Sequence, residues 1–206
     1  MTLRSLVKCS FYYSSSDSSG GIVQLRAGIL NEDMLIKAIP NFFDVNSTPE
    51  YNFKILCINN YGLLLRESIG ASVDGIGVLQ HGVLATAEKE LCVIEVKTRV
   101  SVTTQTEAKR LKRDYGPITV VNFGTDVCKK LIEKAHLAQL VHNAAVTNLQ
   151  TCVYVVGDLR MIYYVVIVNF TETTLLNYRK MMNKIIDDCY PWIKEVYSFV
   201  FFRFFF

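Results

Sequence analysis

The stretches GASVDGIGVL, residues 70–79, and LCVIEVKTR, residues 91–99, decide how this chain is expected to fold. Both are short apolar runs of the kind that forms buried strands, yet each of them carries charge. Asp74 comes just before the apolar residues of the first run, and Glu95 and Lys97 interrupt the second. Because side chains alternate between the two faces of a strand, Glu95 and Lys97 are expected to share one face.

These charged side chains need partners, because burying an unpaired carboxylate or ammonium group is costly. A divalent cation between Asp74 and Glu95 would be such a partner, and oxygen ligands of this kind suit Mg²⁺ or Mn²⁺. Metal ions held in this way activate water and neutralise charge in phosphodiester hydrolysis. Lys97 would then orient or deprotonate the water, or stabilise the developing charge. The alternative is a solvated ion pair on an ordinary strand, which contributes little.

Helical and strand-like segments alternate on both sides of these two runs. Strands are expected at residues 53–58, 62–65, 75–79, 91–98, 118–123, 151–156 and 161–168. Helices are expected at residues 27–43, 126–147 and 172–190, and a basic loop at residues 101–116. This order favours an α/β (α+β) fold with a mixed central sheet flanked by helices.

The length of 206 residues suits one domain with short appendages. The run SSSDSSGG, residues 14–21, has the composition of a linker, so residues 1–21 are expected to form an N-terminal segment. The domain itself is expected to span residues 22–197. The aromatic end SFVFFRFFF, residues 198–206, reads either as an edge strand or as the aberrant end of a reading frame.

Composition limits the classes of protein to consider. Half of the residues are hydrophobic, which is enough for a core, and the net charge is only +3. Any nucleic-acid-binding surface must therefore be local. The six cysteines form no CxxC pair and are expected to be free thiols in a reducing, intracellular compartment, without a zinc site. No secretory signal and no membrane span are expected.

Four segments together resemble the PD-(D/E)XK nuclease superfamily, and within it the lambda-exonuclease-like, or YqaJ-like viral recombinase, group. RAGILNEDMLIKAI resembles the first helix of the group, and YGLLLRESIGASVDGIGV resembles its segment with the S-x-D-G motif. CVIEVKT is similar to the E-[IV]-K strand, and KAHLAQLVHNAAVTNLQTCVYVV resembles the later helix with a glutamine and the strand after it. The resemblance covers about residues 26–170.

The sequence departs from this pattern in three places. Val73 stands where proline is usual, and Thr98 and Arg99 follow the lysine where cysteine and proline are common. Glu95 follows Asp74 by 21 residues, which is longer than the tight hairpin of the group, so the intervening HGVLATAEKE is expected to form an enlarged loop. None of these changes removes a group that the pattern makes catalytic.

The resemblance implies a role for each matching residue. Asp74 and Glu95 would be direct metal ligands, with the carbonyl group of Val96 as a further ligand, and Lys97 would act on the water.

Glu32 would help to bind or position the metal from the first helix, and Gln139 would orient the active-site groups or the substrate. The alternatives are a solvated helix carboxylate for Glu32 and, for Gln139, a polar residue on an amphipathic helix face. That face also carries His136, together with His142 or Asn143. The two histidines are read as structural residues rather than metal ligands.

Basic residues cluster in the run KRLKR, where four cations could neutralise phosphates; a solvated loop or a localisation signal is the alternative. The candidates for nucleic-acid contact are Lys109, Arg110, Lys112, Arg113, Arg99 and Arg26. The resemblance thus implies a Mg²⁺-dependent DNA nuclease, with exonuclease activity favoured and a ring oligomer compatible with the group. Two other readings remain open: a degenerate nuclease fold that binds nucleic acid or a protein partner, and an α/β scaffold or hydrolase whose EVK is an ordinary ion pair.

Overall fold

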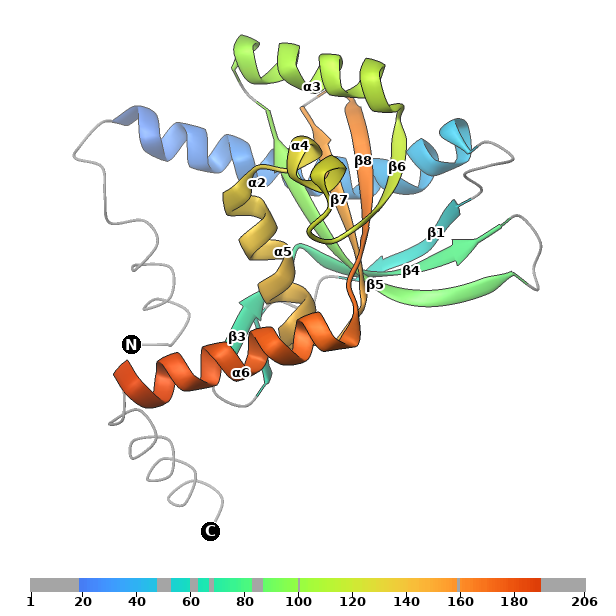
Figure 1. The fold of residues 1–206 in the computed structure, drawn as a ribbon. Coiled ribbons are helices and arrows are strands. Elements are labelled where there is room, and N and C mark those ends of the chain that lie inside the picture. The colour runs from blue at the N-terminus through green and yellow to red at the C-terminus, as the bar shows by residue number, and fades with distance from the viewer. Residues whose placement is uncertain are drawn as a thin grey trace.

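Strands from residues 53–169 meet in one mixed sheet in the computed structural model, which describes residues 19–47, 53–59, 63–66, 69–82, 87–99, 101–158 and 160–189. The sheet strands are β1 (Phe53–Asn59), β4 (Gly75–His81), β5 (Glu88–Thr98), β7 (Thr151–Gly157), β8 (Ile162–Asn169) and β6 (Ile118–Asn122), in that spatial order. The described helices are α2 (Ser19–Asn46), α3 (Val102–Tyr115), α4 (Asp126–Leu131), α5 (Lys134–Thr147) and α6 (Glu172–Cys189). The fold is therefore α/β, with a mixed six-stranded sheet flanked by helices, as predicted (Figure 1).

The middle of the sheet explains the most apolar runs of the sequence. Every residue of β7 is buried, and so is every residue of β8 except the last. β5 runs parallel to β7 and antiparallel to β4, and β8 runs antiparallel to β7. A strand covered on both faces has no solvent side, which is why these segments are apolar throughout rather than alternating.

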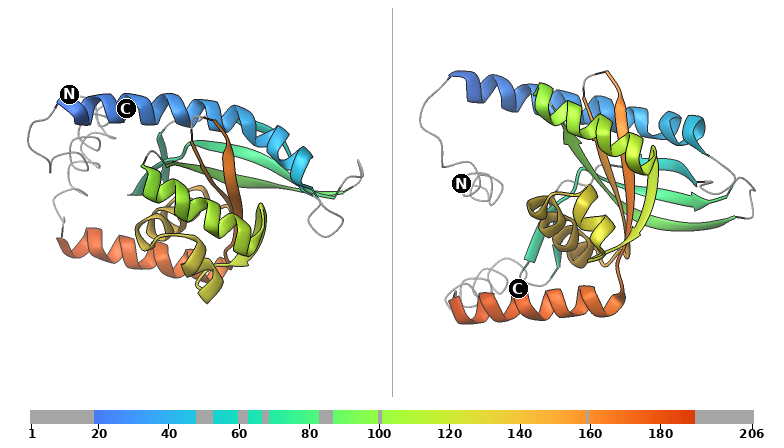
Figure 2. Two further views of the ribbon diagram at one scale, coloured as in Figure 1. Left: turned by 90° about the horizontal axis from the view of Figure 1, so that it is seen from above. Right: turned by 45° about the horizontal axis from the view of Figure 1, so that its top comes forward.

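Helices cover both faces of this sheet. α2 lies along one face, while α3, α4, α5 and α6 lie on the other (Figure 2). On the α2 face, Leu35, Ile39 and Phe43 pack in a core cluster with Ile94 and Val96 of β5. No described helix is long and apolar enough to cross a membrane.

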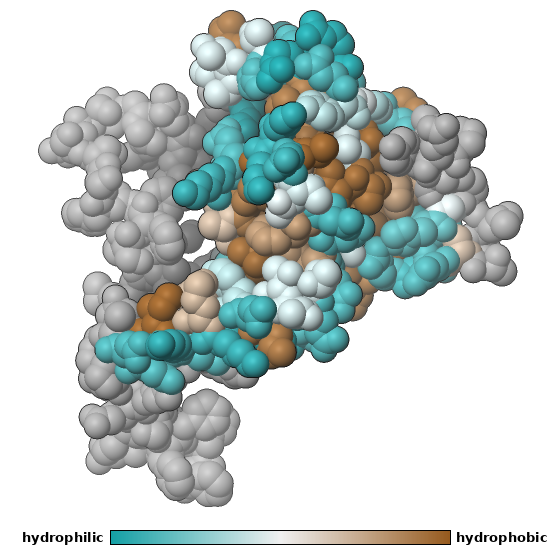
Figure 3. Space-filling view, viewed as in Figure 1, coloured by the Kyte–Doolittle hydropathy of each residue, from teal (hydrophilic) through white to brown (hydrophobic). Residues whose placement is uncertain are grey.

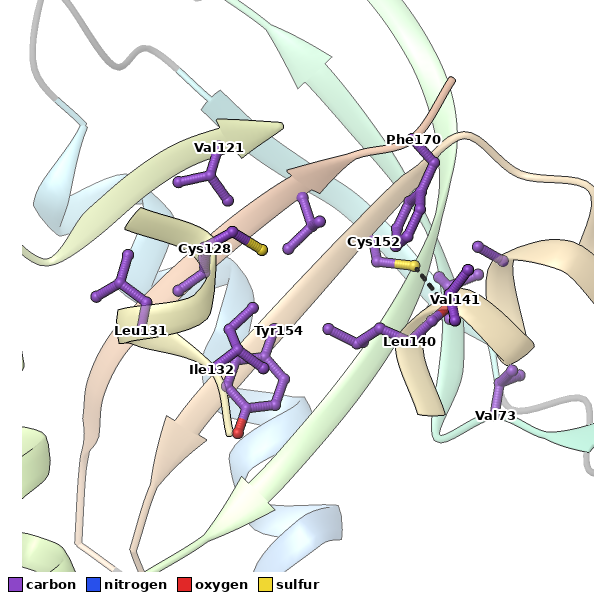
Figure 4. Packing of buried hydrophobic residues seen from close by; sticks show 14 of the residues in the cluster. Val73, Val121, Cys128, Leu131, Ile132, Leu140, Val141, Cys152, Tyr154 and Phe170 are labelled. Atoms are coloured by element: carbon purple, nitrogen blue, oxygen red, sulfur yellow. Dashed lines mark hydrogen bonds between the residues drawn. The ribbon is translucent and has the colours of Figure 1, made fainter. Parts of the chain in front are cut away.

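Buried thiols lie in the core on the opposite face. Cys128 of α4 and Cys152 of β7 are free and fully buried, and the thiol group of Cys152 donates to the carbonyl oxygen of Leu140 at 3.8 Å. Figure 4 shows both side chains among Ile132, Tyr154 and their apolar neighbours. Burial raises the pKa of each of these thiols, which keeps them protonated and unreactive.

The connection from Asp74 to Glu95 is mostly strand, and the prediction of an enlarged loop at HGVLATAEKE is wrong for its first residue and its last three. β4 and β5 pair without a break from Gly75 opposite Ile94 to His81 opposite Glu88, so part of HGVLATAEKE is strand. The extra residues lengthen both strands of one hairpin. In an antiparallel pair each added residue on one strand is matched by one on the other, so the level of the hairpin base is preserved.

The helix predictions need three corrections. The segment predicted as a basic loop is helix α3, capped by the Ser101 hydroxyl group, which accepts from the N–H of Thr104 at 3.2 Å. Its buried residues are Ala108 and Leu111, a stripe too narrow to stand out in the sequence. The predicted helix 126–147 is divided, because Ile132 adopts an extended conformation and buries its side chain. α2 begins at Ser19, so the last residues of the predicted linker are helical.

A separate two-stranded sheet leads into the candidate site. It pairs β2 (Leu63–Arg66) with β3 (Ile69–Ser72); β3 was not predicted. This hairpin is fixed to α5, because His142 Nε2 lies 2.8 Å from the carbonyl oxygen of Gly70 and Arg66 Nε donates to that of Val146 at 3.1 Å. Val73, which follows β3, is buried in the core. The residues that precede Asp74 are therefore held in place by α5 and by the buried side chain of Val73.

Candidate active site

Asp74 and Glu95 lie at the same level of the β4–β5 hairpin. Asp74 immediately precedes Gly75, whose partner on β5 is Ile94, so the residue at the level of Asp74 is Glu95. The Oδ2 atom of Asp74 accepts a hydrogen bond of 2.7 Å from the backbone N–H of Val96. The Asp74 carboxylate therefore accepts from a backbone N–H group of β5 at the point where β4 begins. This hydrogen bond holds the Asp74 side chain beside Glu95.

Glu95 is a fully buried carboxylate in the centre of the sheet. Its Oε1 atom accepts from the ammonium group of Lys97, and its Oε2 atom accepts from the side-chain amide of Asn143 at 2.9 Å. Period-two alternation places Glu95 and Lys97 on one face of β5, as predicted, with Val96 buried on the α2 side. The two donors fix the orientation of the carboxylate.

The carboxylates of this site repel one another. Burial, followed by the charge of Asp74, raises the pKa of Glu95 to about 8, although Lys97 opposes the shift. Burial also raises the pKa of Asp74, against the lowering effects of the Val96 N–H and of Lys97. Desolvation, with the charge of Asp74 added to it at Glu95, therefore outweighs the effect of Lys97, which favours the charged forms.

Glu32 joins this group from α2. It is half-buried, and its pKa is raised first by burial and next by Asp74, while Lys97 lowers it. Glu32 of α2, Asp74 before β4 and Glu95 of β5 are separated in the sequence. The fold brings these three carboxylates near Lys97. Of the residues predicted for the site, Glu32, Asp74, Glu95 and Lys97 are therefore within electrostatic reach of one another.

Asn143 is the residue that the sequence comparison did not assign. It lies on α5 and is 2% exposed. Among the described side chains, Asn143 and Lys97 donate hydrogen bonds to the carboxylate of Glu95. A buried amide in an apolar helix requires a polar partner, and this requirement is the signal that the sequence contained. Gln139, one turn earlier, is half-buried, and its side chain forms no hydrogen bond with another described residue. Its predicted role stays a prediction.

A second polar pair adjoins the site. His136, in the first turn of α5, has its Nδ1 atom 2.8 Å from the hydroxyl group of Tyr154. Tyr154 is the β7 residue that pairs with Glu95 across the parallel ladder. Burial and then the charge of Lys97 lower the pKa of His136, so the imidazole is neutral at physiological pH. The tyrosine holds the ring in place, and the structural role of His136 stays a prediction.

The donor set can be compared with what Mg²⁺ requires. Within the described ranges, no group of three or more Asp, Glu, His or Cys side chains could hold a metal ion. Mg²⁺ commonly takes one or two protein carboxylates and completes its shell with water and substrate phosphate. Asp74 and Glu95 fit that pattern, since they share a level of the hairpin and a cation would relieve their repulsion. The Val96 amide is bonded to Asp74, and a ligand role for its carbonyl group stays a prediction.

The predicted basic residues do not form one surface. Arg110 is held by Glu107 at 2.6 Å and by Asp114 at 3.2 Å on the exposed side of α3. Arg113 contacts Asp114 at 3.0 Å, and the Lys109 ammonium group lies 5.9 Å from the centre of the Tyr163 ring.

Arg99 lies apart from this cluster, two residues after Lys97 of the candidate site, and its Nη2 atom is 2.7 Å from Glu133. Lys112 is half-buried on α3, and the side chain of Arg26 lies outside the described part of the structure.

Searches against known proteins add no relative. No protein-family model matches the sequence, and no curated protein matches it. The resemblance therefore rests on the four quoted segments, and the reading of the site rests on its geometry.

Proposed function

We propose that this chain is a Mg²⁺- or Mn²⁺-dependent deoxyribonuclease that hydrolyses phosphodiester bonds, with an exonuclease activity of the viral-recombinase type. The observation that carries the proposal is the placement of Asp74 at the level of Glu95, with Lys97 bonded to the same carboxylate. The three residues that resemble the D and ExK positions of the nuclease pattern thus come together, although the first two are 21 positions apart in the sequence.

Each residue has a task that follows from its surroundings. Asp74 and Glu95 would hold the cation, and Glu32 would support it from α2. When bound, Mg²⁺ supplies neutralisation of the phosphate charge and activation of water. Lys97 is kept next to the carboxylates by Glu95, so its Nζ atom would donate to the attacking water or to a phosphate oxygen. Asn143 keeps the Glu95 carboxylate from rotating.

The test is cleavage of end-labelled duplex DNA in the presence of Mg²⁺. The wild-type protein should degrade the duplex, and Lys97→Ala should lower the rate by at least about 100-fold, the usual contribution of a positioned proton-transfer group. Lys89→Ala is the matched control, because Lys89 is an exposed lysine on the same strand, about 26 Å away at the usual rise per residue. Blocking the ends of the duplex then separates exonuclease from endonuclease activity.

The competing proposal is a nuclease fold that binds nucleic acid or a protein partner without cutting. One observation favours it: both oxygens of Glu95 already have protein donors, as in a purely structural ion pair. A wild-type protein that binds DNA but leaves it intact in both Mg²⁺ and Mn²⁺ would establish this alternative. Loss of cleavage in Lys97→Ala, with an unchanged melting temperature, would exclude it.

A further inference from the structure

A cavity of about 380 Å³ lies between α3, α4 and β8. Its apolar lining includes Leu111, Ile132 and Tyr164. Three cations line it as well: Arg99, just after the end of β5, and Lys129 and Lys130 on α4. In the space-filling view, hydrophilic residues cover much of α3, and the surface below it mixes hydrophilic and hydrophobic residues (Figure 3). A pocket with apolar walls and several cations suits a ligand that carries phosphate on an apolar body.

Arg99 connects this cavity to the candidate active site. The backbone N–H of Arg99 donates to Gly157 at 2.7 Å, which continues the β5–β7 ladder one residue beyond the strand. Alternation therefore places Arg99 on the same face as Glu95 and Lys97. Two residues of strand span about 6.6 Å. A strand of DNA advances about 3.4 Å per phosphate along its axis, so Lys97 and Arg99 are spaced to reach phosphates of one strand.

The charges around the cavity leave its cations available. The Arg99 side chain is 15% exposed, whereas its partner Glu133 is 60% exposed, and such a half-solvated partner can be exchanged for phosphate. Lys129 contacts Asp126 at 3.4 Å, but that aspartate is 90% exposed, so the pair is weak. Glu107, which also lines the cavity, is committed to Arg110.

The basic cluster at residues 109–113 has the opposite character. Arg110 and Arg113 are paired with carboxylates of their own helix. α3 begins at Val102, just after the end of β5, and each helical residue advances about 1.5 Å. Arg110 therefore lies about 12 Å along the helix from its start, and Arg113 lies farther still.

From these contacts we infer that the cavity is a phosphodiester-binding subsite, in which Arg99, Lys129 and Lys130 hold a DNA strand whose next phosphates reach Asp74, Glu95 and Lys97. The inference rests on the proposed function. In this arrangement the DNA strand follows the cavity rather than the cluster at residues 109–113. The apolar wall with Tyr164 would face a sugar or a base. Glu133 would release Arg99 when phosphate arrives.

The test compares two double charge reversals that alter the net charge equally. Lys129→Glu with Lys130→Glu changes the cavity, and Arg110→Glu with Arg113→Glu changes the 109–113 cluster. Binding of a fluorescent duplex is measured by anisotropy in EDTA, so that cleavage does not interfere, over a series of salt concentrations. The cavity variant should bind at least tenfold more weakly, and the slope of log affinity against log salt should fall by about 2, roughly one for each lost phosphate contact. The cluster variant should match the wild type.

Arg99→Ala should also weaken binding and should lower the slope by about 1. Lys129→Gln with Lys130→Gln gives a milder test if the charge reversals lower the melting temperature. Equal losses in the two double variants, or an unchanged affinity in the cavity variant, would overturn the inference. A wild type that binds through the cavity without cutting would refute the nuclease proposal alone. Cleavage at the wild-type rate by both double variants would refute the subsite alone.

Discussion

The side-chain amide of Asn143 donates a 2.9 Å hydrogen bond to the buried carboxylate of Glu95. This bond joins α5 to the centre of β5 and holds the carboxylate in one orientation together with Lys97. A buried carboxylate that loses one of its donors keeps the full cost of its desolvation. The contact therefore makes Asn143 a positioning residue for the proposed metal site.

Replacing Asn143 with alanine should lower DNA cleavage by about 10- to 100-fold, the usual effect of removing a partner of a metal-binding side chain. The Mg²⁺ concentration that gives half-maximal activity should rise, since the carboxylate is no longer held in place. Asn122→Ala, at an exposed position at the end of β6, is the matched control. An Asn143→Ala protein that melts at a lower temperature but keeps its Mg²⁺ dependence would show that the residue is only structural.

The pKa of Glu95 predicts how stability depends on pH in the absence of metal. Burial raises this pKa from 4.5 to about 8, so the folded protein holds the proton more tightly than the unfolded chain. The stabilisation is complete below about pH 4.5 and is lost as the pH rises to about 8, at about 1.4 kcal/mol per pH unit at most. The melting temperature in EDTA should fall over this range, and Glu95→Gln should flatten the dependence.

Addition of Mg²⁺ should raise the melting temperature more at about pH 8 than at about pH 5, because the cation competes with the proton for Glu95. Differential scanning calorimetry at both values, with and without EDTA, measures the difference. Glu95→Gln should lose most of the Mg²⁺ effect. An equal effect of Mg²⁺ on the variant and on the wild type would place the ion elsewhere.

Glu32 provides a test of the contribution from α2. Its raised pKa reflects burial and the nearby charge of Asp74, whereas the adjacent Asp33 is exposed. Glu32→Gln should therefore weaken activation by Mg²⁺ by about tenfold, and Asp33→Asn, which removes the same charge from the same helix, should not. Titration of cleavage with Mg²⁺ distinguishes them. Similar shifts in the two variants would mean a general electrostatic effect rather than a specific one.

The tight packing around Gly75 predicts that a larger residue there would disturb the neighbouring Asp74 of the candidate site. A Cβ atom at this position would lie 2.7 Å from the Cγ2 atom of Ile58 on β1 and 3.6 Å from the Cβ atom of Ile94. Gly75→Ala should cost about 1–3 kcal/mol and should displace the adjacent Asp74. Ile58→Ala removes the opposing methyl group, so the double variant should regain cleavage relative to Gly75→Ala alone. Urea denaturation and cleavage rates measure the two effects, and purely additive losses would contradict this packing account.

The sequence by itself determined most of the sheet. Runs such as TCVYVV, residues 151–156, are apolar throughout because β7 is covered on both faces, and this pattern needs no tertiary information to be recognised. Alternation along β5 likewise placed Glu95 and Lys97 on one face. The sequence did not reveal α3, because a helix that contacts its neighbours through Ala108 and Leu111 has too little apolar periodicity.

Only the tertiary structure decided which residues meet. The level of Asp74 relative to Glu95 depends on the register of two paired strands, and the sequence between them looked like an enlarged loop because strand extension and loop extension add the same residues. The choice of Asn143 as the partner of Glu95 depends on how α5 is rotated over the sheet, which is set by packing rather than by spacing along the chain. The chemical types of the site residues are thus written in the sequence, whereas their convergence follows from strand register and helix packing.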